Sequence, residues 1–278
     1  MDLHLRWVVG SILLLSNFVI ADIIGEKASV TQGKPNLNCP QFQIYGYPSN
    51  SNPKILRRGF YTCRIGYAAL YDPAERTPLW VAEHVSKINF SGDAERDQLD
   101  FILDPDIPSG ALPSPIDYEN SGFDKGHMAP AANFKSSQRA MNATFRFANA
   151  VPQTPQSNRG VWKQLEDATR QIAIRRGELY VISGPIFSAA KRSKLNNRVS
   201  IPDAVFKVLI DSRRGLMTGF VVPNTASPGK DFRTYQVKVR DIEWLTGLNF
   251  NPKLPRALAD KMEVLNSGNW PLPGDSKR

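Results

Sequence analysis

Residues 158–187 read NRGVWKQLEDATRQIAIRRGELYVISGPIF, and their pattern changes from that of a helix to that of a strand. In the first part, apolar side chains recur at spacings of three and four residues, which indicates an amphipathic helix. These side chains are Val161, Trp162, Leu165, Ala168 and Ile172. Residues 178–187 are rich in branched and aromatic side chains, which favours a strand. The stretch therefore predicts a helix followed directly by a strand.

The strand pattern recurs on both sides of this stretch. Further strands are expected at residues 59–72, 79–87, 204–211 and 216–224, and a second helix at residues 234–248, ending near Gly247. The helices interrupt the strands without a regular alternation. This order predicts an α+β fold, with a mixed or antiparallel β-sheet core flanked by helices.

The composition is that of an ordinary globular protein with an excess of positive charge. Of 278 residues, 41% are hydrophobic and 22% are charged. Lys and Arg number 35 against 26 Asp and Glu, so the formal net charge is +9. This charge favours polyanionic partners such as nucleic acid or an anionic membrane surface. Basic clusters at 175–177, 189–198 and 211–215 are candidates for a binding face, and equally for solvated loops.

The N-terminus has the pattern of a signal peptide. Residues 1–6 contain one arginine, residues 7–21 are apolar and uncharged, and Val19 and Ala21 are small enough for cleavage after Ala21. We expect a secreted or periplasmic protein; an uncleaved membrane anchor is the competing interpretation. After cleavage no stable membrane association is expected, because no other segment approaches the length of a membrane span.

The remaining chain is expected to hold one domain. Residues 22–35 are polar and predict a flexible segment, residues 36–266 a single domain, and residues 267–278 a polar C-terminal tail. The two cysteines, Cys39 and Cys63, predict one disulfide in an oxidising compartment. A zinc site is not expected, because it requires more ligands than these two thiolates offer.

One of the three histidines has chemically active neighbours. His4 lies in the leader, and His84 alternates with apolar residues in an expected strand, which indicates a structural role. His127 lies in residues 121–134, SGFDKGHMAPAANF, directly after Asp124, Lys125 and Gly126. An isolated histidine in a loop is usually structural, so its role depends on the residues that follow.

Downstream of the histidine, two asparagines and a glutamate add oxygen donors. Asn149 and Asn158 bracket a loop containing two prolines, and Glu166 follows Asn158 by eight residues. On one continuous helix, such a pair would project within about 80° of each other and face one site. Oxygen donors of this kind suit Mg²⁺. The competing interpretations are a helix N-cap for Asn158 and an exposed helix position for Glu166.

These residues resemble the DNA/RNA non-specific endonuclease family of the ββα-metal, or His-Me finger, group. The family signature is Asp-Arg-Gly-His, present here as DKGH, followed by an asparagine-rich segment, a tryptophan and a glutamate. Further similar blocks occur in the family's order: ERTPLWVAEHV, LYVISGPIF, IPDAVFKV and DIEWLTGLNF. The resemblance covers most of residues 40–250 and implies a ββα-metal finger at the active site.

The resemblance assigns roles to individual residues. It implies that His127 is the general base, that Asn158 is the one direct protein ligand of a divalent metal, and that Glu166 holds metal-bound water. Asn149 would support the histidine region and the substrate, and Arg76 would contact a phosphate.

Within the signature itself, Asp124 is expected to be an orienting partner. Gly126 is expected to permit a tight turn. Lys125 replaces the usual arginine, and it keeps the charge but cannot make a two-pronged contact with phosphate.

The implied function is an exported, metal-dependent, sequence-non-specific endonuclease that cleaves DNA and RNA to 5′-phosphate ends. Its cofactor would be Mg²⁺, with Mn²⁺ or another divalent cation as alternatives, and a homodimer and an inhibitor protein are open partners. The alternative is a catalytically weak or inactive nucleic-acid-binding protein on the same fold. The joint presence of His127, Asn158 and Glu166 favours the enzyme.

Overall fold

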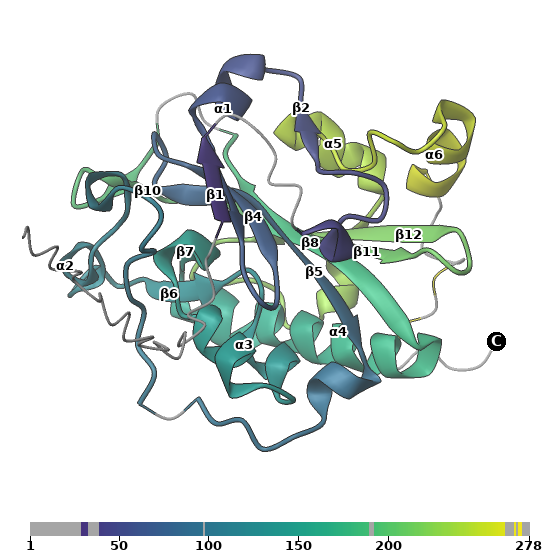
Figure 1. Cartoon of the computed structure of the whole chain (residues 1–278), viewed down its shortest axis with the longest axis horizontal. Coiled ribbons are helices and arrows are strands. Elements are labelled where there is room, and N and C mark those ends of the chain that lie inside the picture. Colours follow the sequence, from purple (N-terminus) through teal and green to yellow (C-terminus); the bar gives the residue numbers. More distant parts are fainter. Residues whose placement is uncertain are drawn as a thin grey trace, which may run out of the picture.

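A computed structural model describes residues 29–32, 39–96, 98–188, 192–264, 270 and 272–273. The expected signal peptide and its cleavage site lie outside these residues. At the centre is an eight-stranded antiparallel sheet with the order β1-β3-β4-β5-β8-β11-β12-β13. The long strands β5 and β8 run diagonally through the middle of the molecule (Figure 1).

Four strands of the sheet, β5, β8, β11 and β12, follow predicted segments closely. The eight strands are β1 (Ser29–Gln32), β3 (Phe60–Cys63), β4 (Ala68–Asp72), β5 (Thr77–Ser86), β8 (Glu178–Ile186), β11 (Ala204–Asp211), β12 (Leu216–Pro223) and β13 (Gln236–Val237). The segment expected as one strand at 59–72 is a hairpin of β3 and β4. Its turn is closed by a hydrogen bond of 2.8 Å from the Arg64 amide to the Tyr67 carbonyl.

Helices cover both faces of the sheet (Figure 1). One face packs against α3 (Gln138–Ala143) and α4 (Lys163–Arg176), and the other against α5 (Val239–Thr246) and α6 (Arg256–Glu263). Side chains alternate between these two cores along each strand, so that Val81 faces α4 while its neighbour Trp80 faces the opposite core. The predicted α+β fold with an antiparallel core is confirmed.

The smaller elements lie around this sheet. Two short helices are α1 (Pro53–Arg58) and α2 (Pro115–Tyr118), and the remaining strands are β2 (Ser49–Asn50), β6 (Asp124–His127), β7 (Ala150–Gln153), β9 (Lys194–Leu195), β10 (Val199–Ser200) and β14 (Leu248–Asn249). Short 3-10 helices are Pro40–Phe42, Lys87–Phe90, Ser109–Ala111, Ala131–Phe134, Phe147–Asn149 and Phe232–Tyr235.

The helix predicted at residues 234–248 is shorter than expected. It begins at Val239, because Gln236 and Val237 instead pair with Phe220 and Gly219 and so extend the sheet. Its predicted end is confirmed, since Gly247 adopts a left-handed conformation with φ 68° directly after the last helical residue.

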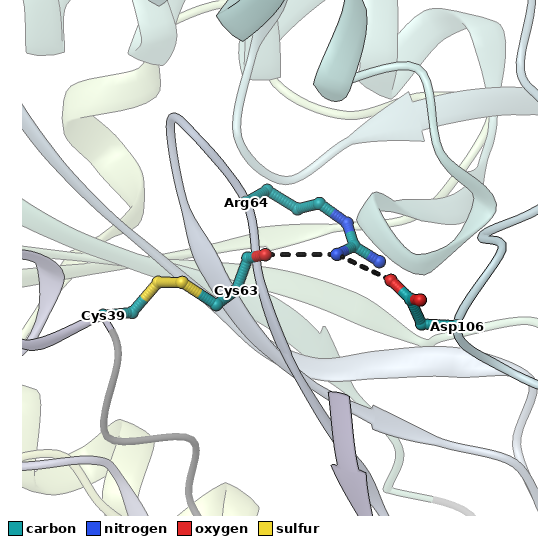
Figure 2. The surroundings of a disulfide bond; sticks show 4 residues. All are labelled: Cys39, Cys63, Arg64 and Asp106. Atoms are coloured by element: carbon teal, nitrogen blue, oxygen red, sulfur yellow. Dashed lines mark hydrogen bonds and ion pairs between the residues drawn. A yellow bond between two sulfur atoms is a disulfide. The ribbon is translucent and has the colours of Figure 1, made fainter. Parts of the chain in front are cut away.

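The predicted disulfide joins Cys39 to Cys63 (Figure 2). It ties the segment before β2 to the end of β3. The buried side chain of Arg64 donates to the Cys63 carbonyl at 3.1 Å and pairs with Asp106 at 3.2 Å, and it also pairs with Asp104. The disulfide ties residue 39 to the end of β3, and Arg64 anchors the loop around residues 104–106 to the same strand end.

Both ends of the described chain differ from their expected flexibility. Ser29–Gln32, within the segment expected to be flexible, pairs with β3 at the edge of the sheet. Trp270, within the expected polar tail, is buried, and the Arg176 guanidinium lies 4.2 Å from its ring centroid. Packing of the domain therefore continues beyond residue 266. Among the described residues, no helix has the length and apolar character needed to cross a membrane.

Candidate active site

Strands β6 and β7 form a two-stranded antiparallel ribbon that carries the DKGH stretch. Gly126 lies within this ribbon and not in a turn, which corrects the expected reason for a glycine. A Cβ atom at this position would lie 1.9 Å from Oε1 of Gln153 on the partner strand, so a side chain does not fit. The ribbon is followed by α4, which completes the strand, strand and helix order of the expected finger.

The segment between β7 and α4 is not a regular helix. Residues Ser157–Trp162 form a π-helical turn in which Gly160, with φ −101° and ψ −109°, breaks the helical path. The relation expected for Asn158 and Glu166 on one continuous helix therefore does not apply. Tertiary packing nevertheless brings both side chains to the wall of one cavity.

This cavity has a volume of about 700 Å³ and lies against the finger. It is lined by five of the residues predicted from the sequence, namely Asp124, Lys125, His127, Asn158 and Glu166. Other residues that line the cavity were not predicted from the sequence; they include Arg96, Asp100, Phe101, Phe145 and Arg170. Most of these residues come from the loop 91–108 and from α3–α4, where nothing in the local pattern distinguishes them from ordinary surface residues.

His127 lies between two aromatic rings at the base of the cavity. The centroids of Phe101 and Phe145 are 4.6 and 4.8 Å from that of the imidazole, and Nε2 is buried without a hydrogen-bond partner among the described residues. Burial, with a further contribution from the positive charge of Arg96, lowers the pKa of His127 to about 3. The imidazole of a free histidine has a pKa of about 6.5. The aromatic surroundings of His127 lower its pKa because they disfavour the charged imidazolium.

A buried lysine supports the finger from the sheet side. The Nζ of Lys207 on β11 donates to Ser183 Oγ at 2.7 Å and lies 4.6 Å from the ring centroid of Trp162. The indole Nε1 of Trp162 in turn donates to the main-chain carbonyl of His127 at 3.3 Å. This chain of contacts connects the centre of the sheet to the strand that holds the histidine.

Asp124 holds two other residues of the cavity lining, Asn158 and Arg159. Its Oδ2 accepts hydrogen bonds from Nδ2 of Asn158 at 2.9 Å and from Nε of Arg159 at 2.8 Å. Burial would raise the pKa of this carboxyl, but the hydrogen bonds from Arg159 and Asn158 lower it below its usual value. Asp124 is therefore an anionic partner, and Asn158 does not cap a helix: its amide is held by Asp124.

Glu166 is one of three described carboxylates whose pKa is raised to about 7; the others are Glu83 and Glu243. Burial raises the pKa of Glu166 to about 7, against the opposing effects of Lys207 and Arg170. Burial likewise raises the pKa of Glu83, on β5, to about 7, and both oxygens of this carboxylate accept from Nδ2 of Asn133 at 3.1 and 3.0 Å. Glu166, in the lining of the cavity, and Glu83, outside that lining, thus change charge near neutral pH.

Asn133 connects this buried carboxylate to the cavity wall. Its Oδ1 accepts a hydrogen bond of 3.0 Å from Arg170, and Arg170 also pairs with Asp167. Arg170 therefore presents a held guanidinium next to Glu166 in the lining of the cavity.

Two predicted residues do not reach the cavity. Asn149 is fully buried and uses its amide on the main chain, accepting from the Ala129 amide and donating to the Ala129 and Thr144 carbonyls, all at 2.9 Å. It supports the segment after His127 without facing the cavity. Arg76 lies in the turn between β4 and β5 and donates to the Leu112 carbonyl at 2.8 Å.

His84 and two of the basic clusters also lie elsewhere. His84 contacts Glu178 at 3.1 Å and stacks on Tyr180, as expected for a structural histidine. Arg176 and Arg214 both pair with Asp211 at 2.7 and 3.0 Å. These arginines are held by intramolecular ion pairs at the end of α4 and the β11–β12 turn, away from the cavity lining.

The donor set of the cavity fits a hard divalent cation. The amide nitrogen of Asn158 is engaged by Asp124, which leaves its carbonyl oxygen for a ligand, and the Glu166 carboxylate makes no hydrogen bond within the described residues. Among the residues that the structure describes, no group of three or more His, Cys, Asp and Glu side chains could hold a metal. One amide oxygen near a carboxylate suits Mg²⁺, which keeps several waters, and does not suit a zinc-type cage.

Known proteins resemble this chain over most of its length. The human protein named Nuclease EXOG, mitochondrial, is 37% identical over 211 residues, which are 70% of this chain and 57% of that protein. A protein named Nuclease from Nostoc sp. is 31% identical over 237 residues, 79% of this chain and 85% of that protein. The chain spans less than two thirds of the first curated relatives that it matches.

Solved structures and a family model agree with these relatives. A chain in the crystal structure of the EndoG/EndoGI complex, which concerns inhibition of EndoG, superimposes with a TM-score of 0.69 at 28% identity, covering 78% of this chain and 92% of that one. The model of the DNA/RNA non-specific endonucleases matches residues 40–257. With the finger, the cavity and these similarities together, the chain belongs to the DNA/RNA non-specific endonuclease family.

Proposed function

We propose that this protein is a metal-dependent endonuclease that hydrolyses the phosphodiester bonds of DNA and RNA without reading their sequence and leaves 5′-phosphate ends. One observation carries the proposal: the buried, unpartnered Nε2 of His127 shares a cavity with Asn158 and Glu166. A buried imidazole nitrogen without a hydrogen-bond partner is unusual in a folded protein, and a catalytic role is one explanation for it. The family supplies the reaction class.

His127 is the general base in this proposal. Its lowered pKa keeps the imidazole neutral at physiological pH, so Nε2 is free to accept a proton from an attacking water. A pKa of about 3 describes a weak base in the protein alone. A bound phosphodiester places negative charge beside the ring and offsets Arg96, which raises the pKa of the imidazole toward the value that the reaction needs.

Asn158 and Glu166 would hold the divalent cation and its water. When bound, this cation would neutralise charge developing on the phosphate and on the leaving oxygen. Asp124 fixes the amide of Asn158, so that the carbonyl oxygen is presented to the cavity. Arg96 and Arg170 line the same cavity and provide positive charge for the phosphate oxygens.

The cavity favours substrates by charge and not by sequence. Its cationic side chains are suited to phosphates, and contacts to phosphates position a nucleic acid without reading its bases. The reaction scheme uses no 2′-hydroxyl group, so DNA and RNA are both expected substrates. Binding of this kind weakens as salt concentration rises.

The alternative function is nucleic-acid binding without turnover on the same fold. The intact set of His127, Asn158 and Glu166 in one cavity favours the enzyme. Supercoiled plasmid and structured RNA would be incubated with the purified mature chain in Mg²⁺ or in EDTA, beside His127→Ala and the matched control His84→Ala. We expect Mg²⁺-dependent cleavage of both polymers, lost only in His127→Ala.

Binding without cleavage under every divalent metal would establish the alternative. The ends of the products give a separate test of the chemistry. Fragments with 5′-phosphates are joined by DNA ligase without prior kinase treatment, whereas fragments with 5′-hydroxyls are not.

We further propose that the N-terminal leader exports the chain. The name of the human relative places that protein in mitochondria and lends no support to export here. The apolar residues 7–21 favour a signal peptide, because a mitochondrial targeting segment is amphipathic and rich in arginine. Fusion of residues 1–35 to a reporter, followed by fractionation of the native host, tests the proposal, and a mitochondrial or cytosolic reporter would contradict it.

A further inference from the structure

Four of the five cationic side chains that line the cavity are already paired with carboxylates of the same chain. Lys125 pairs with Asp100, Arg159 with Asp124, and both Lys163 and Arg170 with Asp167. Arg96 is the cavity cation without an ion pair among the described residues. A substrate phosphate that reaches one of the paired cations must compete with a resident anion.

Asp100 differs from the other two acids. Its side chain is 72% exposed, against 42% for Asp167 and 15% for Asp124, which is also held by Asn158. Oδ1 of Asp100 accepts from Nζ of Lys125 and from the Phe101 amide, both at 2.7 Å. The hydrogen bond from Lys125 lowers the pKa of Asp100, so the carboxylate is charged at neutral pH.

The ion pair of Asp100 and Lys125 lies close to His127, the proposed general base. Phe101, directly after Asp100, packs on the imidazole of His127, and Lys125 precedes His127 by two residues on β6. The Asp100 carboxylate and the Lys125 ammonium therefore both line the cavity next to the proposed base.

We propose that Asp100 is an affinity-determining residue: its carboxylate occupies Lys125 in the free protein, in the place of a substrate phosphate, and nucleic acid must displace it. The proposal rests on the proposed function of this cavity. An exposed ion pair contributes little stability, so a polyanion can displace it. The displaced carboxylate remains near the phosphate and repels it, which weakens binding.

The lysine in the signature fits this role. An ammonium is a compact point charge, whereas a guanidinium has donors enough to hold two anions at once. With lysine at position 125, the carboxylate of Asp100 and a phosphate compete for the same charge. Asp100 therefore tunes the strength of phosphate binding at the one position where this chain departs from the family signature.

The test measures binding without turnover. Affinity for a short fluorescein-labelled single-stranded DNA is measured by anisotropy in EDTA, across a range of salt concentrations, for the wild type and for Asp100→Asn. The matched control is Glu119→Gln, which removes the same charge from another exposed carboxylate of the same cavity. Both variants are also made in a Lys125→Met background.

We expect Asp100→Asn to bind about twofold to fivefold more tightly than the wild type, the range that an exposed ion pair allows. The slope of log affinity against log salt should steepen by about 0.7, as one more phosphate is neutralised on a single strand. Glu119→Gln should give a smaller gain. In the Lys125→Met background, Asp100→Asn should give no more than Glu119→Gln.

Weaker binding by Asp100→Asn would overturn the proposal, since Asp100 would then hold Lys125 in place for the substrate. An equal gain in Glu119→Gln, or an undiminished gain without Lys125, would overturn it in favour of a general charge effect. Gel analysis of the same samples checks that the strand stays intact. Failure of the nuclease function would be seen separately, as absent cleavage in Mg²⁺ whatever the affinities.

Discussion

Nδ2 of Asn158 donates a 2.9 Å hydrogen bond to Oδ2 of Asp124, a residue 34 positions earlier in the chain. This bond connects the first residue of the DKGH ribbon to the proposed metal ligand. It settles which atom of the amide faces the ligand, because an amide whose nitrogen is engaged presents its oxygen elsewhere. The acid of the signature thus orients the amide of Asn158, the proposed metal ligand.

Asp124→Ala should therefore weaken the affinity for Mg²⁺ by about 10- to 100-fold, the usual effect of removing a residue that orients a metal ligand. Isothermal titration with Mg²⁺ and the Mg²⁺ dependence of cleavage measure it. Arg159→Ala is the matched control, since it removes the ion pair with Asp124 but keeps the bond to Asn158. An equal loss in both variants would show that the ion pair, and not the amide, matters.

Gly126→Ala should destabilise the finger by about 1–3 kcal/mol through overpacking. The new methyl group would lie 1.9 Å from Gln153 Oε1, so the buried side chain of Gln153 would have to shift. Gly110→Ala is the control, because nothing lies within 4 Å of a Cβ atom there. Urea unfolding measures both variants, and a Gly126→Ala protein as stable as Gly110→Ala would contradict the close packing.

At subsaturating Mg²⁺, the fall of kcat/KM toward acid pH should come from Glu166. Its pKa is raised to about 7, so the carboxylate loses its charge as the pH falls below neutrality, whereas His127 has a pKa of about 3 and stays neutral. Glu166→Gln should reduce activity at pH 8 by about 10- to 100-fold and flatten this part of the profile. A fall near pH 6.5 that persists in the variant would instead assign the titration to His127.

Glu83 should make the metal-free protein less stable as pH rises. Its pKa is raised from 4.5 to about 7 by burial, so between these values the unfolded chain has released the proton and the folded chain retains it. The contribution of Glu83 to stability is therefore largest below pH 4.5 and is lost as pH rises through about 7.

The variant Glu83→Gln has no titratable carboxyl group at this position. From pH 5 to pH 8, its free energy of unfolding should change relative to the wild type by roughly 1–3 kcal/mol in favour of the variant. Urea unfolding in EDTA at the two pH values gives this difference. A difference that does not change with pH would mean that Glu83 is charged in both states.

Loss of the disulfide should cost about 3 kcal/mol, because Cys39 and Cys63 close a loop with a sequence separation of 24. The double variant Cys39→Ala/Cys63→Ala should unfold at a lower urea concentration than the oxidised wild type. Addition of a reductant should lower the stability of the wild type toward that of the variant and leave the variant unchanged. A wild type insensitive to the reductant would show that the bond adds no stability.

Much of the fold was predictable because periodicity is a local property. The strands at residues 79–87, 178–187, 204–211 and 216–224 are found within a few residues of their expected bounds, since each alternates or concentrates β-branched side chains. The prediction of a single strand at residues 59–72 was wrong, because a turn of four residues between two strand-like segments leaves little local signal. The prediction of a helix at residues 236–237 was wrong, because these residues pair with β12 in the sheet despite their helical spacing.

The candidate site was predictable in part for a different reason. His127, Asn158 and Glu166 were found by the order and spacing of a family pattern, and the structure places them in one cavity. Arg76 and Asn149 match the same pattern, yet both bond to the main chain outside the cavity. Sequence order identifies the residue types, but not which partner satisfies each side chain.

The sequence by itself determined the α+β class with a mixed or antiparallel sheet and flanking helices, the cysteine pair and the identity of the acid, lysine, glycine and histidine in the finger. Only the tertiary structure decided that Lys207 is buried beneath the site, that Asp124 holds Asn158, and that Asp100 holds Lys125. The reason is physical: secondary structure follows from neighbouring side chains, whereas charge pairing and pKa depend on burial and on groups far away in the chain.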